Sequence, residues 1–205
     1  MTFASKRNAL SIAFLAVVAF AQSSCNSTHV PRGADNEGLV TGRLLSVNPL
    51  EVVVLPIENH TGDASVPCAA MREQFQQGLV QLRYSPLALS FVDRSSGVVE
   101  ASYKPGALGE HAVLRVVLTG WDDSRWKSHA HLVVDADIYM LDAANPDPSM
   151  ALWGGHAVRT VDLELQRNSV AGDEALRQRA VEEVVSGILG SLPARNPERS
   201  NGPTR

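Results

Sequence analysis

The sequence has few of the residues and none of the motifs that mark the common classes of enzyme. Its 205 residues include two cysteines, Cys25 and Cys68, and 5% aromatic side chains. The patterns G-x-S-x-G, G-x-x-x-x-G-K-[ST], G-x-G-x-x-G and H-E-x-x-H are absent. These patterns mark serine hydrolases, phosphate-binding loops, dinucleotide-binding folds and zinc proteases. We therefore predict that the protein is not an enzyme and holds no cofactor.

The sequence also lacks a long run of one charge. It has 18 basic and 22 acidic residues, for a net charge of −4. A nucleic-acid-binding surface is strongly basic, so nucleic acid is not an expected partner. The hydrophobic content of 44% and charged content of 20% are typical of a globular protein, and the length suits one domain with tails.

The longest apolar run lies at the N-terminus, over residues 8–21 (NALSIAFLAVVAFA). It is too short for a membrane-spanning helix, which needs about 20 apolar residues. Lys6 and Arg7 precede it, and the small residues of QSSC follow. A basic start, an apolar stretch and a small-residue end together predict an export signal over residues 1–24.

Two ways of processing this signal remain open. Cleavage after Ala21, in the A-x-A pattern, would release a soluble periplasmic protein. Alternatively, Ser23-Ser24-Cys25 resembles the end of a bacterial lipobox, whose cysteine is acylated and becomes the new N-terminus. Gln22 departs from the apolar residue usual in a lipobox, and Asn26 is not the Asp that retains lipoproteins in the inner membrane. We predict a lipidated Cys25 and an anchor, such as palmitate chains, at the periplasmic face of the outer membrane.

The second cysteine, Cys68, is predicted to be a small buried apolar residue on a helix. If Cys25 is not acylated, a Cys25–Cys68 disulfide becomes available in the oxidising periplasm.

The chain after the signal divides into three parts. Residues 25–48 contain Pro31 and several glycines without a sustained hydrophobic period, which predicts a flexible tether. Residues 49–192 form the predicted domain. Residues 193–205 are polar and carry two prolines near their start, which predicts a disordered tail.

Within the domain, hydrophobic patterns predict one α/β (α+β) sandwich, with a mixed sheet of about five strands and two main helices packed on it. The first helix has Ser65 as its N-cap, and its Gly78 permits close packing on the sheet. Gly154-Gly155 predicts a bulge in the last strand, and the last three strands form a meander. The predicted strands are Glu51–Ile57, Leu87–Asp93, His111–Trp121, His129–Leu141 and Met150–Leu163, and the helices are Val66–Arg83 and Val170–Leu192.

Four ionisable residues share one face of the strand predicted at 129–141: His129, His131, Asp135 and Asp137. A metal-dependent hydrolase would need such ligands to converge. Same-face positions on a strand are instead spaced about 6.6 Å apart in a row. We therefore predict a solvated sheet face and no metal site.

Four other residues are the predicted contacts for a protein partner. Trp126 lies in a charged connection, whereas Trp121 and Trp153 lie at strand ends and are expected to cap the core. Asn59, Thr61 and Asp63 form a polar turn directly after the first buried strand.

Two stretches resemble a known group of proteins. VVVLPIENHTGD with its following helix, and AVLRVVLTGWDD with VVDADIYMLDAANPDPSMALWGG, span residues 50–165. They resemble bacterial envelope lipoproteins that include the curli-secretion lipoprotein family, the TolB N-terminal domain and the outer-membrane activators of penicillin-binding proteins. Lipoproteins related to a meningococcal surface antigen show the second pattern too. The resemblance implies a small α/β domain without catalysis that binds envelope proteins, and some members of the group oligomerise.

The sequence therefore predicts a lipid-anchored periplasmic module that binds other envelope proteins in envelope assembly or secretion. Copies of the chain itself are an alternative partner. The alternatives are a soluble periplasmic ligand-binding domain and, with less support, a metal-dependent hydrolase that uses His129 and His131.

Overall fold

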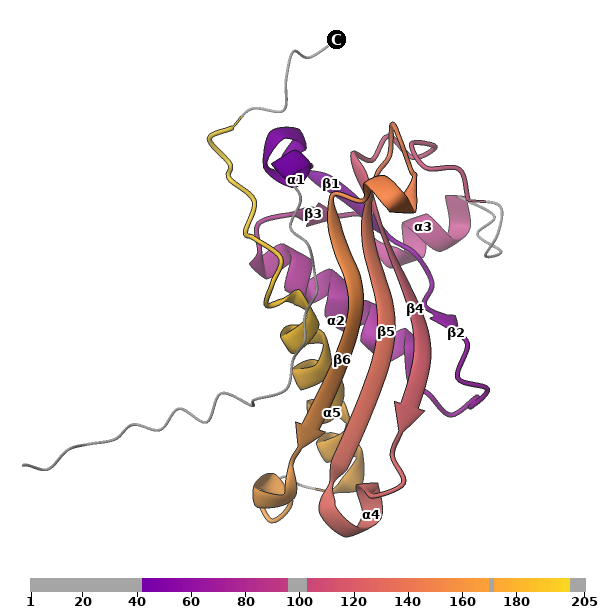
Figure 1. The fold of residues 1–205 in the computed structure, drawn as a ribbon, viewed down its shortest axis with the longest axis vertical. Helices are drawn as coiled ribbons and strands as arrows, with labels where there is room; N and C mark the ends of the chain where they lie inside the picture. The colour runs from indigo at the N-terminus through magenta and orange to yellow at the C-terminus, as the bar shows by residue number, and fades with distance from the viewer. Residues whose placement is uncertain (1–41, 96–102, 170–171, 200–205) are drawn as a thin grey trace, which may run out of the picture. The chain divides into compact units, whose positions relative to one another are not determined.

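The computed structural model describes residues 42–95, 103–169 and 172–199. These residues fold into a six-stranded sheet with helices on both of its faces (Figure 1). The strands are β1 (Glu51–Val54), β2 (Glu58–Asn59), β3 (Ser85–Pro86), β4 (Ala112–Asp122), β5 (His131–Asp142) and β6 (Trp153–Asp162). The helices are α1 (Gly42–Val47), α2 (Cys68–Gln81), α3 (Leu89–Ser95), α4 (Trp126–His129) and α5 (Asp173–Leu189), with short 3-10 turns η1 (Pro148–Met150) and η2 (Glu164–Gln166).

The sheet is mixed, and its order is β3-β1-β4-β5-β6, with β2 paired to β4 beyond the end of β1. β1 runs parallel to both β3 and β4. β4, β5 and β6 form an antiparallel meander. The structure therefore confirms the predicted mixed sheet, its meander and the α/β class.

One face of the sheet carries the main core. In β1, Val52 and Val54 point to this face, and the strands of the meander send alternate residues to it. α2 and α5 cover this face, as Figure 1 shows behind β4–β6. Phe75 of α2 and Val184 of α5 are fully buried there. The two main helices predicted from the apolar stripes thus pack where the sequence placed them.

A second, smaller core lies on the opposite face. Val53 of β1 and Val113 of β4 meet Val92 of α3 there, and all three are fully buried. The strand predicted at Leu87–Asp93 is wrong, because this segment forms α3 and only Ser85–Pro86 pairs as β3. A short apolar run fits a strand and a buried helix equally well. Here the segment is helical, and its Val92 covers Val53 of β1 and Val113 of β4.

Three local predictions about the helices and strands also need correction. α2 begins after Pro67 without a side-chain cap, so Ser65 is not its N-cap. A Cβ on Gly78 would overlap Leu189 Cδ1, so this glycine permits the close approach of α5 to α2 and not of α2 to the sheet. Gly154 and Gly155 pair in unbroken register with β5, and the irregularity lies instead in β4 between Leu118 and Gly120.

The packed unit extends beyond the predicted domain edges at residues 49 and 192. Leu44 of α1 is buried in the main core. The Asn48 side chain donates hydrogen bonds to the Asn196 and Arg199 carbonyl oxygens at 2.9 and 2.7 Å, and the Arg195 backbone N–H donates to Leu82 O. Asn48, just before the predicted domain, is therefore hydrogen-bonded to residues just after it. Among the described residues, no helix combines the length and apolar character that crossing a membrane requires.

Candidate functional site

A cavity of about 190 Å³ lies at the end of the sheet where β4 finishes, between α2, α4 and α5. Its wall is apolar toward the core and charged toward the solvent, so it offers both burial and polar contacts. The lining residues are Ser65, Pro67, Ala70, Trp121, Asp123, Trp126, Leu132, Glu174, Arg177, Gln178, Ala180 and Val181.

Trp126 forms the fixed part of the wall. The residue is only 2% exposed. Its indole Nε1 donates a hydrogen bond to Asp173 Oδ1 at 2.9 Å, and the Arg177 guanidinium lies over its ring, 5.0 Å from the centroid. The sequence placed Trp126 in an exposed connection, but the short helix α4 turns its ring under α5. The indole therefore links α4 to α5, and it takes part in the cavity wall instead of projecting as an exposed contact.

Trp121 is the aromatic residue that remains partly accessible in the cavity. It is half-buried on β4 and packs against the main core. Trp153, by contrast, is buried, and its Nε1 lies 3.3 Å from Ser191 Oγ. The prediction that both residues cap the core edge agrees with these positions. Trp121 also lines the cavity of about 190 Å³, which the sequence pattern did not indicate.

Charges are concentrated along the rim. Arg177 forms ion pairs with Asp123 at 3.3 Å and with Asp173 at 3.1 Å. The hydrogen bond from Trp126 lowers the pKa of Asp173, and Arg177 lowers it further, while desolvation opposes both. Glu174 also lines the cavity. Among the residues that line the cavity, Arg177 is the only cation, and Asp123 and Glu174 are the two anions, so the lining itself has a net negative charge. Arg167 lies outside the lining and acts on Asp173 from nearby.

The polar turn predicted as a contact is a tightly bonded loop beside this cavity. The Asn59 side chain donates to Asp63 O at 2.7 Å, and its Oδ1 accepts from the Thr61 N–H and hydroxyl. Asp63 Oδ1 accepts from the Ser65 N–H at 2.8 Å, which lowers the pKa of Asp63. Ser65 itself lines the cavity. The loop is therefore joined to the rim through Ser65.

The start of this loop is fixed to the sheet. β2 pairs with β4 at Val117 and Leu118. The Arg115 guanidinium donates to both carboxylate oxygens of Glu58, at 2.7 and 3.0 Å, which lowers the pKa of Glu58. A paired strand and a two-point ion pair together set where Asn59 leaves the sheet.

Three of the four residues in the predicted row, His131, Asp135 and Asp137, share the less buried face of β5, and His129 does not. His129 belongs to α4 and not to the strand. The His131 ring lies 2.8 Å from an Arg125 nitrogen, while Asp135 and Asp137 both face His156 of β6, at 3.3 and 3.1 Å. No cluster of three or more metal-ligating side chains forms among the described residues. His156 was missed because only strand pairing brings it opposite Asp137.

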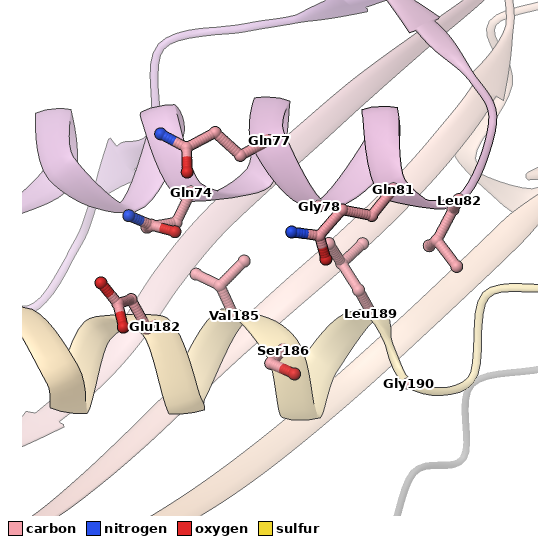
Figure 2. A pocket seen from close by; sticks show the side chains of 10 residues that line it. All are labelled: Gln74, Gln77, Gly78, Gln81, Leu82, Glu182, Val185, Ser186, Leu189 and Gly190. Carbon is pink, nitrogen blue, oxygen red and sulfur yellow. The ribbon is translucent and has the colours of Figure 1, made fainter.

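A second hollow runs between the outer sides of α2 and α5 (Figure 2). Its volume is about 390 Å³. Figure 2 shows the side chains of Gln74 and Gln81 projecting from α2 and that of Glu182 from α5. Long amide side chains adapt to many surfaces, and no buried aromatic residue fixes a binding mode here. We therefore regard the cavity lined by Trp121 and Trp126, here named the tryptophan cavity, as the better candidate site.

Of the two cysteine predictions, the structure tests only the one for Cys68. Cys25 lies outside the described residues. Cys68 is a free thiol at the first position of α2, half-buried and packed against the main core. Burial raises the pKa of its thiol. Because the thiolate is the reactive form, this cysteine is poorly suited to act as a nucleophile.

No protein-family model matches the sequence, and no curated protein sequence matches it. Solved structures provide the comparisons. The chain is similar to a dodecamer of a PelC variant from Paraburkholderia phytofirmans, with 15% identity, 73% of this chain and 91% of that chain covered, and a TM-score of 0.45.

Two further structures are similar to a comparable extent. The lipoprotein GNA1162 from Neisseria meningitidis shares 21% identity, with 70% and 99% of the two chains covered and a TM-score of 0.47. A hypothetical protein from Chlamydia trachomatis shares 11% identity, with 69% and 99% covered and a TM-score of 0.41. At these values the similarities assign neither a family nor an activity. The similar structures include a bacterial lipoprotein, in partial agreement with the predicted resemblance. Membership of the curli-secretion and TolB N-terminal group stays a prediction.

Proposed function

We propose that the protein is an exported, lipid-anchored periplasmic module that binds other envelope proteins and assists envelope assembly or secretion, without catalysing a reaction. The export signal followed directly by Cys25 supports the anchor. Several acyl chains hold a protein on a membrane stably, whereas one chain holds it only marginally. We place the module at the periplasmic face of the outer membrane.

The observation that carries the binding role is the cavity beside Trp121. Sites for small molecules are usually about 300–1,000 Å³. At about 190 Å³ the cavity suits one apolar side chain of a protein partner better than a whole ligand. Protein interfaces concentrate their binding energy in such anchor pockets, where tryptophan is a frequent contributor.

The rim favours a particular kind of partner. Asp123 and Glu174 lie at the cavity, and Asp63 lies two residues before the rim residue Ser65. Arg177 is already paired with Asp123 and Asp173. We therefore expect a partner segment in which an apolar anchor residue is flanked by lysine or arginine, because complementary charges speed association and fix the register.

The binding role is tested by Trp121→Ala. The full-length variant and the native protein are purified from solubilised envelopes, and co-purifying proteins are quantified by mass spectrometry. We expect one partner to fall by at least about tenfold, which is the cost of an interface hot spot, and to bind the purified native domain directly. The control is Phe91→Ala, which trims a residue 43% exposed on α3, away from the cavity. Equal recovery with both variants would contradict the proposal.

The anchor is tested separately, by feeding cells radioactive palmitate. We expect label in the native protein and none in Cys25→Ala. An unlabelled native protein would favour our second candidate function, a soluble periplasmic ligand-binding domain released after Ala21. The partly accessible indole of Trp121 in the same cavity favours that candidate. Binding of a small molecule that Trp121→Ala abolishes would support it.

A further inference from the structure

The two edges of the sheet are built differently. β3 forms one edge with only two residues, and one of them is Pro86, which has no N–H to donate. β6 forms the other edge with ten residues, Trp153–Asp162, and contains neither proline nor lysine. Short strands, proline and lysine are common protections of an exposed edge. By strand length and by proline and lysine content, the β6 edge is the less protected of the two edges in the described sheet.

The register shows which atoms β6 offers. Each β5 residue pairs with a fixed β6 residue, from His131 with Asp162 to Met140 with Trp153. In the same register, the Leu163 N–H donates to Ala130 O at 3.0 Å. Hydrogen-bonded pairs alternate along an antiparallel ladder. Odd-numbered residues of β6 therefore bond to β5, and the even-numbered residues 154–162 direct their N–H and C=O groups to the free edge.

Within the described part of the chain, these outward groups have almost no partners. No backbone bond involves the even-numbered residues of β6 on the side away from β5. Val158 O accepts one long side-chain bond, from Arg159 Nη1 at 3.4 Å. This contact also places the Arg159 guanidinium at the free edge.

Arg159 is a buried cation without a carboxylate partner among the described residues. It is 6% exposed, and its side chain lies on the helix-covered face. Nη2 donates to Gly187 O of α5 at 2.6 Å, while the buried Nε has no partner. Burial lowers the pKa of the guanidinium. A Cβ on Gly187 would lie 3.1 Å from Nε, so this glycine leaves the side chain its room.

We propose that β6 accepts an extended segment of a protein partner as an added strand, and that an aspartate or glutamate of this segment pairs with Arg159. Opposite residues of neighbouring strands have Cβ atoms about 4.5–5.5 Å apart on the same face. A carboxylate opposite Arg159 would thus reach the guanidinium beside α5. Main-chain bonds to the even-numbered residues would provide affinity, and the acidic residue would provide register.

The strand-addition proposal rests on the proposed role in binding envelope proteins, but it concerns a surface separate from the tryptophan cavity. The competing explanation for Arg159 is edge protection, because a charged residue that points inward on an edge strand discourages pairing. The two explanations differ in the outcome for a peptide: strand addition requires that acidic segments bind, whereas protection requires that none do.

The experiment uses a displayed library of random decapeptides, selected on the purified native protein. We expect enriched peptides with alternating β-branched residues and one acidic position. Their affinity, measured by fluorescence anisotropy, should fall at least about tenfold for Arg159→Met, which corresponds to the loss of one charge-assisted pair. Thr160→Pro should give a similar loss, because the N–H it removes points to the free edge. Thr160→Ala is the matched control and should bind as the native protein does.

Folding of each variant is checked by circular dichroism and urea unfolding. Trp121→Ala should bind the enriched peptides normally, so a failure at β6 is distinguishable from a failure of the cavity. The proposal is overturned if no peptide is enriched, if the enriched peptides lack an acidic position, or if Arg159→Met and Thr160→Pro bind them unchanged. Self-association of Arg159→Met, together with no peptide binding by the native protein, would also overturn it in favour of edge protection.

Discussion

The two faces of the sheet differ in what covers them. On one face, α2 and α5 bury a continuous core that takes in residues of β1, β4, β5 and β6. On the other, α3 covers a small cluster around Val53 of β1 and Val113 of β4, against which Tyr103 and Leu108 also pack. The rest of that face, over β5 and β6, carries half-exposed polar side chains such as Asp135, Asp137 and His156. The apolar contacts that stabilise the fold thus lie mainly on the face covered by α2 and α5. The surface accessible to a partner lies mainly on the opposite face, which is here called the polar face.

This separation explains why the polar face is a poor source of stability. Its contacts between histidine and carboxylates are exposed: the His156 side chain is 55% accessible, and its partners Asp135 and Asp137 are 39% and 36% accessible. Exposed pairs contribute at most about 1 kcal/mol. A fully buried apolar residue on the other face contributes several times more. The polar face and the β6 edge can therefore change to suit a partner without loss of the fold.

The largest expected effect is on the covered face. Phe75→Ala removes a fully buried ring of α2 from the main core and should lower the free energy of unfolding by about 3–5 kcal/mol. Urea unfolding followed by tryptophan fluorescence measures the change. The control is Val158→Ala, which trims a residue 37% exposed on the polar face and should cost under about 1 kcal/mol. Equal losses would mean that the polar face is covered in solution.

A smaller effect is expected where the two covering helices meet. Gly78→Ala places a methyl group against Leu189 Cδ1 of α5, so the leucine must move. Overpacking costs about 1–3 kcal/mol, and the better helix propensity of alanine returns up to about 1 kcal/mol. We expect a net loss of about 1 kcal/mol by urea unfolding. Val80→Ala, at a residue 58% exposed on the same helix, is the control and should be nearly neutral. A stabilised Gly78→Ala variant would show that α2 and α5 are less tightly packed than the structure indicates.

The contribution of Asp173, at the rim of the tryptophan cavity, to the free energy of unfolding should depend on pH. The bonds from Trp126 and Arg177 hold the pKa of Asp173 below its ordinary value of 3.8. A carboxylate with a lowered pKa stabilises the fold above about pH 4, and this contribution disappears as the pH falls through the native pKa. Asp173→Asn should cost about 0.5–1 kcal/mol at pH 7, because the site is largely exposed. The difference from the native protein should vanish at pH 2, as measured by urea unfolding at both pH values. A difference that persists at pH 2 would mean that the substitution acts through the changed shape of the side chain and not through the loss of its charge.

The smallest effect is expected on the polar face itself. Asp137→Asn removes one of the two carboxylates facing His156 and should change the free energy of unfolding by less than about 0.5 kcal/mol. Differential scanning calorimetry at low and high salt checks this, since salt screens an exposed pair. A loss above about 2 kcal/mol would be typical of a buried pair, and would break the contrast between the two faces.

Some parts of the candidate site could be predicted from sequence because their cause is local. The turn at Asn59–Asp63 follows from side chains that bond to their own neighbouring backbone. The cavity could not be predicted, because its wall comes from α2, β4, α4 and α5, which are distant in sequence. Trp126 shows the difference. Its charged neighbours suggested exposure, yet the contact with Asp173, 47 residues later, buries it.

The sequence by itself determined the pattern of strands and helices wherever the hydrophobic period was long. The alternation in β5 and the apolar stripes of α2 and α5 each repeat over several turns or pairs, so local physics was sufficient. Only the tertiary structure decided the short segment that became α3, because its choice depended on which face of β1 and β4 still needed cover. Only the tertiary structure placed Arg159 on the last strand of the described sheet, because the order of the strands depends on pairing between residues that are distant in sequence.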